Sequence, residues 1–148
     1  MTKYKNEVAK NTRQFFINKV PEILAFAGCR ENVLLSGHDL NMPKVTSSNK
    51  NSAESLIFKV WQALEYIKAI KDTLDTMKPL YKQVIELTYF EHLRTYEIAQ
   101  RVGYAEQTIK NVKNEILNDF AIRFFAVQAR SGIEDKHIID LTKIKLAV

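Results

Sequence analysis

Six polar residues between positions 106 and 114 have side chains that could recognise a nucleic acid: Glu106, Gln107, Lys110, Asn111, Lys113 and Asn114. Glutamine and asparagine amides can pair with the edge of adenine, and a glutamate can accept a hydrogen bond from cytosine. Lysine ammonium groups can neutralise backbone phosphates. Gathered on one exposed helix face, these residue types predict binding to double-stranded DNA. A helix face that only meets solvent would have a similar composition, so the neighbouring elements must decide between the two interpretations.

The pattern around these residues predicts helices separated by tight turns. A helix with an apolar face is expected over 79–92, a helix of eight residues from 95 or 96 to 102, and a long helix over 106–130. Ala99 is small enough for the short helix to cross the next helix closely, and Gly103 is the residue type that best tolerates a left-handed turn. This order of short helix, glycine turn and long helix is typical of a helix-turn-helix.

Three stretches of this region resemble region 4 of bacterial sigma factors. They are YKQVIELTYFE at 81–91, EIAQRVG at 97–103 and TIK at 108–110. The resemblance implies a DNA-binding helix-turn-helix in which DNA contacts fall on the recognition helix, at Glu106, Gln107, Lys110 and Asn111. The family usually has a serine at the position that opens this helix, where the present chain has Ala105.

The layout of the whole chain is similar to that of small phage late-gene transcriptional regulators of the ArpU and RinA type. The shared features are an N-terminal helical part, a polar linker, a long helix opened by Glu54 and a sigma-like helix-turn-helix. The resemblance implies a phage or prophage origin and a role as activator at packaging, lysis or morphogenesis promoters. Beyond promoter DNA, it leaves open three further partners: RNA polymerase, a phage or mobile-element regulatory protein, and a second copy in a homodimer.

The composition favours one all-α helical bundle with an N-terminal helical segment. Four glycines and three prolines in 148 residues are few for a β-sandwich or barrel, which needs many tight turns. The formal charge of +5 is compatible with a polyanionic partner but does not identify one. We divide the chain into an N-terminal helical segment (1–35), a polar linker (36–52), a helical domain (53–130) and a C-terminal tail (131–148). The helix-turn-helix occupies about 80–120 within the helical domain.

Outside the central motif, the apolar spacing gives further expectations. Pro21 predicts two short helices that meet near it, because an interior proline removes a hydrogen bond. A helix is expected to begin at Asn51 or Ser52 and to reach about Met77, with a core-facing stripe that includes Ile57 and Val60. The tail fits a helix slightly better than a strand. Residues 1–50 are expected to supply association or polymerase contact, not sequence readout.

The same sequence argues against an enzyme, a cofactor and a metal centre. His38, His92 and His137 lie far apart and lack the spacing of a helical metal site. The run Ser36-Gly37-His38-Asp39 places catalytic residue types side by side, but a triad depends on spatial assembly and turn chemistry explains the run better. Cys29 is the only cysteine, which fits a reducing cytoplasm. The resemblance to phage regulators implies that this is the cytoplasm of a bacterial host, where a DNA-binding protein is expected to associate with the nucleoid. No stretch is apolar enough to predict a membrane span.

Two alternatives remain open beside a regulator. A small terminase-like DNA-packaging protein would also be a small helical DNA binder, but it would assemble into a ring that native mass measurement detects. A sigma-like module could instead act mainly by protein–protein contact and bind polymerase without binding promoter DNA.

Overall fold

The computed structural model describes residues 2–35 and 52–143, and the regular elements in these two ranges are all helical. In chain order they are α1 (Thr2–Gln14), a π-helical turn (Phe15–Lys19), α2 (Val20–Ala27), a 3-10 turn (Glu31–Leu34), α3 (Ser52–Thr76), α4 (Pro79–Ile85), a second π-helical turn (Glu86–Phe90), α5 (Thr95–Val102), α6 (Glu106–Arg130) and a 3-10 turn (Asp135–His137). No strand occurs in these ranges, which confirms the predicted all-α class.

Several expectations fall on residues outside the described ranges. They are the polar linker except for Ser52, the run Ser36-Gly37-His38-Asp39, the helix cap at Asn51 and the end of the tail at 144–148. The helix after the linker begins at Ser52 and ends at Thr76, close to the predicted limits.

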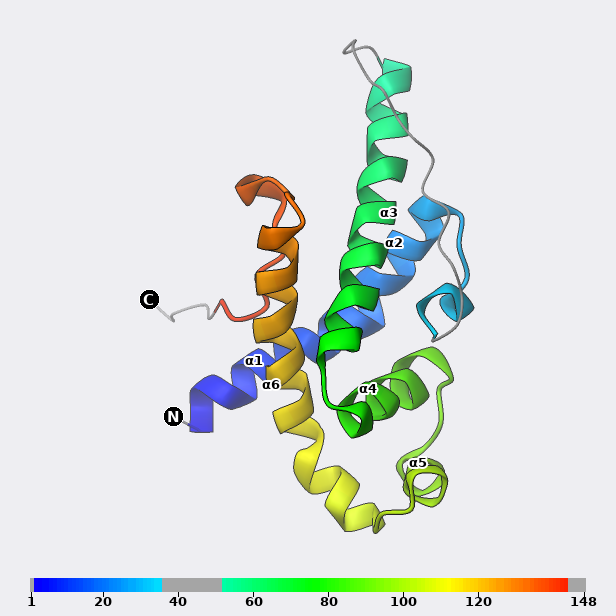
Figure 1. Cartoon of the computed structure of the whole chain (residues 1–148), viewed down its shortest axis with the longest axis vertical. Helices are drawn as coiled ribbons and strands as arrows, with labels where there is room; N and C mark the ends of the chain where they lie inside the picture. The colour runs from blue at the N-terminus through cyan, green and yellow to red at the C-terminus, as the bar shows by residue number, and fades with distance from the viewer. Residues whose placement is uncertain (1, 36–51, 144–148) are drawn as a thin grey trace.

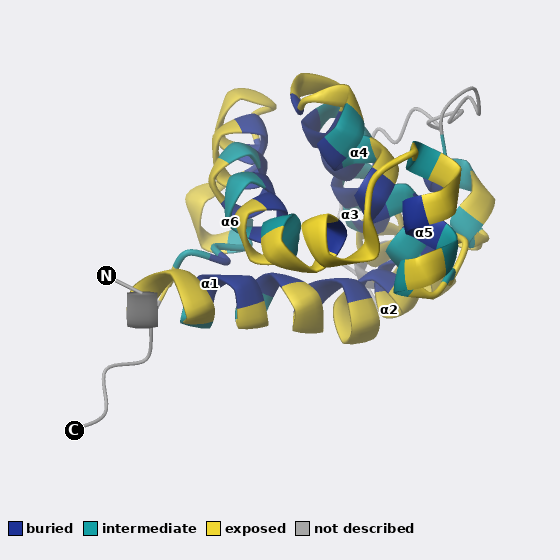
Figure 2. Ribbon diagram, turned by 90° about the horizontal axis from the view of Figure 1, so that it is seen from below, coloured by how far each residue is buried: buried dark blue, intermediate teal, exposed yellow. Residues whose placement is uncertain are grey.

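The long helices α3 and α6 lie side by side, with α1 crossing α6, α2 packing against α3, and α4 and α5 at one end (Figure 1). The core fills the space where these helices meet. Phe15 and Phe16 from the first π turn pack against Phe120 and Phe124 of α6, with ring centroids 5.2 Å apart for Phe15 and Phe124 and 4.7 Å for Phe16 and Phe120. All four rings are buried, and the inner side of α1 is buried from Val8 onward (Figure 2). The N-terminal helices therefore belong to the same core as the helix-turn-helix.

Two helices, α1 and α2, meet near Pro21 as predicted, but they are joined by a π turn and not by a break in the helical path. The helical path continues from Thr2 to Ala27 through the π turn, in which the Val20 N–H donates to the carbonyl of Phe15, five residues back. The change of hydrogen-bond pattern falls just before the proline, which then stands in the first turn of α2. A proline is tolerated there because its missing N–H is not needed within that turn.

The first half of α3 differs from the predicted core stripe. Ile67, Ile70 and Leu74 in the second half are at most 1% exposed, whereas Ile57 and Val60 are 48% and 39% exposed. The placement of Ile57 and Val60 in the core was therefore wrong. Figure 1 shows the reason, since α3 extends beyond the ends of α2 and α6 and has no helix beside its first turns.

The segment that follows α6 forms a 3-10 turn and then irregular backbone up to Lys143, so the expected helix is absent there. This segment is docked on the core, with Ile133 and Leu141 buried. The buried side chain of Gln128 replaces helical hydrogen bonds: its Nε2 donates to the Ile139 carbonyl and its Oε1 accepts from the Ile139 N–H, both at 2.9 Å. An apolar pattern cannot reveal a backbone pairing of this kind.

Candidate nucleic-acid interface

Two tight turns set the ends of α5. Before the helix, His92 adopts φ of 58° and the Glu97 carboxylate accepts a hydrogen bond from the Arg94 N–H at 3.0 Å. After it, Gly103 adopts φ of 78° and its N–H donates to the Ala99 carbonyl at 2.9 Å. These contacts confirm the predicted helix over 95–102 and the left-handed glycine that ends it.

The packing of α5 against α6 fixes which side of α6 meets solvent. Ile98 on α5 and Ile109 on α6 are fully buried, and Ala99 is nearly so. Because Ile109 points inward, the residues on the other side of the first turns of α6 must point outward. The two helices and the Gly103 turn thus have the arrangement of a helix-turn-helix, with α6 as the recognition helix.

Four of the six predicted DNA-contacting residues lie together on this outward side. They are Glu106, Gln107, Lys110 and Asn111, and all four are exposed. They interact pairwise across one helical turn: Gln107 Nε2 donates to Asn111 Oδ1 at 2.9 Å, and Lys110 Nζ lies 3.5 Å from Glu106 Oε1. The face therefore presents an amide pair beside an exposed ion pair.

Lys113 and Asn114 are engaged with other helices. The half-buried Lys113 directs its Nζ to Thr95 Oγ1 on α5, at 3.3 Å. Asn114 is exposed but meets α1, because its Oδ1 accepts from Arg13 Nη2 at 3.3 Å and its Nδ2 donates to Asn6 Oδ1 at 3.4 Å. These two residues form the edge of the outward side, at the junction with α1 and α5.

Positive groups from two helices gather at this junction. The pKa of Lys113 is lowered from its ordinary value, first by burial and then by the charges of Arg13 and Lys110. Arg13 also interacts with the Tyr89 side chain, where it opposes the rise that burial causes in the tyrosine pKa. The hydrogen bond to Asn114 and the effect on the Lys113 pKa both place Arg13 of α1 beside α6.

Sequence reasoning missed Arg13 and the two aromatic residues beside the turns. Tyr96 at the start of α5 is 48% exposed, and Tyr104 after Gly103 is 49% exposed. Their positions in the motif could have identified these tyrosines as candidate phosphate contacts. No sequence signal could have identified Arg13, which is 101 positions from its partner Asn114.

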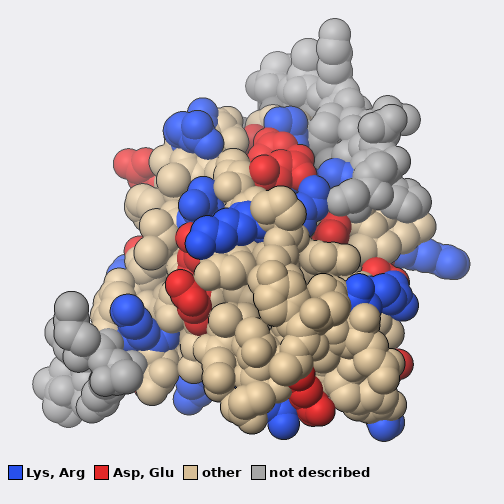
Figure 3. All heavy atoms as spheres, turned by 60° about the horizontal axis from the view of Figure 1, so that its bottom comes forward, with Lys and Arg blue, Asp and Glu red and all other residues tan. Residues whose placement is uncertain are grey.

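Basic side chains do not form one continuous patch on the end of the molecule that carries α5 and the start of α6. Figure 3 shows Lys and Arg groups on this side separated by uncharged and acidic side chains. A protein that binds a polyanion by charge alone would be expected to have a larger, continuous patch of positive charge. This mixed surface fits a site where polar contacts add to charge.

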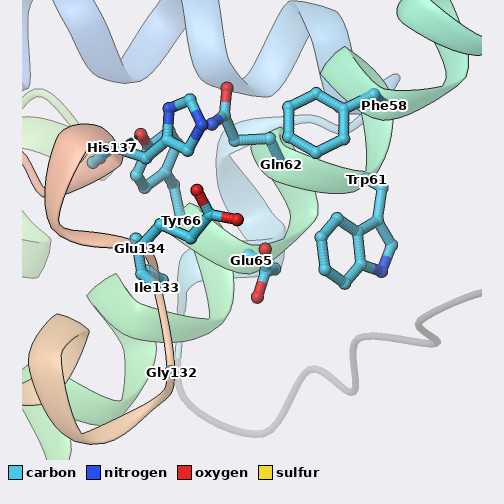
Figure 4. A pocket seen from close by; sticks show the side chains of 9 residues that line it. All are labelled: Phe58, Trp61, Gln62, Glu65, Tyr66, Gly132, Ile133, Glu134 and His137. Carbon is cyan, nitrogen blue, oxygen red and sulfur yellow. Dashed lines mark hydrogen bonds between the residues drawn. The ribbon is translucent and has the colours of Figure 1, made fainter. Parts of the chain in front are cut away.

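The described residues offer little for other kinds of site. Within 2–35 and 52–143, no group of three or more His, Cys, Asp or Glu is placed to hold a metal ion, and no helix is long and apolar enough to cross a membrane. His92 pairs with Glu31 at 2.6 Å. A small cavity of about 90 Å³ lies between α3 and the segment 132–137, lined in part by Phe58, Trp61 and His137 (Figure 4).

These observations define a helix-turn-helix protein. Residues 67–111 match the family model for sigma-70, region 4. The match covers less than a third of the chain: it begins in α3, contains α4 and α5, and ends in the second turn of α6. No curated protein and no solved structure matches the chain. The matched segment is a sigma-70 region 4-like helix-turn-helix, a type of domain typical of DNA-binding proteins that are not enzymes.

Proposed function

We propose that this chain is a sequence-specific transcriptional regulator that binds double-stranded DNA by placing the start of α6 in the major groove. The observation that carries the proposal is the exposed group of Glu106, Gln107, Lys110 and Asn111 on the recognition helix of a sigma-70 region 4-like domain. A helix of this kind enters the major groove with its first turns nearest the bases. The functional side chains lie in those turns.

The two amides are the proposed sequence-reading groups. Their mutual hydrogen bond leaves Gln107 Oε1 as an acceptor and Asn111 Nδ2 as a donor for a base edge. A donor and an acceptor side by side match adenine, which presents N7 and the N6 amino group in the major groove. Glu106 can accept from the amino group of cytosine, while Lys110 can reach a phosphate.

Lys113 and Asn114 have a different proposed role at the edge of the interface. Both are bonded to other helices in the free chain, so they are less free than the four outward residues to turn toward bases. Lys113 already lies beside the first residue of α5. We assign to these two residues contacts with the DNA backbone, which set affinity and orientation more than sequence preference.

The biological role that we propose is activation of phage late genes for packaging, lysis or morphogenesis. The resemblance of the chain layout to regulators of the ArpU and RinA type supports this role. Such an activator acts in the cytoplasm of a bacterial host, binds promoter DNA on the nucleoid and works with RNA polymerase. A homodimer would bind two half-sites whose spacing follows the helical repeat of DNA.

Footprinting on fragments of the parent genome tests the proposal. The full chain should protect a discrete site upstream of a late gene, and Gln107→Ala should lose the protection at the same protein concentration. Two protected half-sites about 10 base pairs apart, centre to centre, would show that a dimer binds. If no fragment were protected while RNA polymerase was retained in a pull-down, the module would act by protein contact and the proposal would be wrong.

A further inference from the structure

The helix α1 lies outside the segment that matches sigma-70, region 4, yet it packs against α6 beside the recognition surface. Its inner side is anchored in the core by Val8 and Ala9, which are 2% and 1% exposed. Arg13 lies on the exposed side of the same helix and reaches Asn114 on α6. The core contacts of α1 therefore fix the place of Arg13 relative to the DNA-facing turns.

The charges at this junction are incompletely balanced. Lys110 has Glu106 as an ion-pair partner at 3.5 Å. Within the described part of the chain, Arg13 and Lys113 form no ion pair with a carboxylate, and the partners of their hydrogen bonds are neutral. The pKa of Lys113 is lowered first by burial and then by the positive charges of Arg13 and Lys110, so these like charges repel one another in the free state. An anion at the junction would relieve this repulsion.

We propose that Arg13 and Lys113 together bind one phosphate of the DNA backbone, which makes α1 a part of the DNA interface. The inference rests on the proposed function, because it needs α6 to lie in the major groove. The Arg13 guanidinium has five N–H donors, of which the contacts with Asn114 and Tyr89 leave some free, in a planar fork that matches two phosphate oxygens. Asn114 holds the guanidinium in place before DNA arrives, so less side-chain freedom is lost on binding.

The test compares salt-dependent binding of the full chain to a labelled 24-base-pair duplex of random sequence. Arg13→Gln should lower the slope of log K against log salt concentration by about 0.9, the value for one lost phosphate contact. The ratio of the wild-type binding constant to that of this variant should then fall about 3.5-fold between 50 and 200 mM salt. Arg13→Lys should keep the slope and lose affinity, because the charge remains and the fork is lost.

Controls separate this inference from the proposed function and from folding. Arg130→Gln removes the same charge at the far end of α6 and should leave the slope unchanged (Figure 1). Melting temperatures of the variants should stay near that of the wild type, since Arg13 is exposed. If Lys110→Gln lowered the slope but Arg13→Gln and Arg13→Lys both bound as the wild type does, the α1 contact would be refuted and the proposed function would stand. If the wild type bound no duplex, the α1 contact and the proposed function would both be refuted.

Discussion

Replacement of Gly103 should destabilise the helix-turn-helix by an amount set by backbone conformation. Gly103 has φ of 78°, and a Cβ built there would have no atom within 4 Å. The space is open, so a steric clash with neighbours contributes nothing. The remaining cost is that of holding an L-residue in the left-handed region, about 1–2 kcal/mol.

Gly103→Ala should therefore lower the free energy of unfolding by about 1–2 kcal/mol, which corresponds to a decrease of about 2–8 °C in melting temperature for a chain of this size. Gly103→Val should lower it further, because a branched side chain tolerates positive φ poorly. Gly103→Asn should lower it least, since asparagine adopts this conformation more readily. Thermal unfolding followed by circular dichroism measures all three.

Gly132→Ala is the matched control for the effect on DNA. Gly132 has φ of 84° after the end of α6 and equally open surroundings, so its replacement should reduce stability by a similar amount. Only the Gly103 variants should also weaken DNA binding, because only that turn sets the angle between α5 and α6. If Gly103→Ala and Gly103→Val melted at the wild-type temperature, the left-handed turn between these helices would be refuted.

Three further changes test the packing around the site. Lys113→Met removes the ammonium group that lies near the charges of Arg13 and Lys110 and keeps an apolar side chain. The free chain should therefore melt about 1–2 °C higher, while its affinity for DNA falls. A melting temperature below that of the wild type would contradict the charge repulsion. Gln128→Leu leaves the Ile139 amide and carbonyl without their side-chain partners, and hydrogen exchange at the Ile139 amide should accelerate; unchanged exchange would show that the C-terminal segment is held by other contacts. Deletion of residues 1–35 removes Phe15 and Phe16, two of the five buried phenylalanines of the described core. Truncation of a buried phenylalanine costs about 3–5 kcal/mol, against a total stability of about 5–15 kcal/mol. A fragment that still melted cooperatively would contradict the single core.

The central motif could be predicted from sequence because local signals determine it. Gly103 ends one helix, Ile98 and Ile109 provide the small core between two helices, and the polar positions that follow must point away from it. Each of these relations spans a few residues. The outward placement of Gln107 and Asn111 follows from helical periodicity once Ile109 is assigned inward.

The rest of the site depends on contacts that periodicity cannot reveal. Nothing near Asn114 in the sequence indicates that Arg13 of α1 lies beside it. Likewise, nothing near Lys113 indicates that its side chain is half-buried and reaches Thr95 of α5. The π turn that joins α1 to α2 before Pro21 could not be predicted, because a π turn has no distinct apolar spacing. The apolar positions in 1–35 were assigned to partner contacts, although the core formed with α3 and α6 accounts for many of them.

Selection of DNA sites from a random duplex library tests the central claim most directly. The full chain should enrich one motif over successive rounds, with adenine at the positions that face the Gln107 and Asn111 amides. Asn111→Ala should retain binding to bulk duplex and lose enrichment at those adenine positions. The account would be contradicted if the wild type enriched no motif, or if Asn111→Ala and Gln107→Ala both enriched the wild-type motif unchanged.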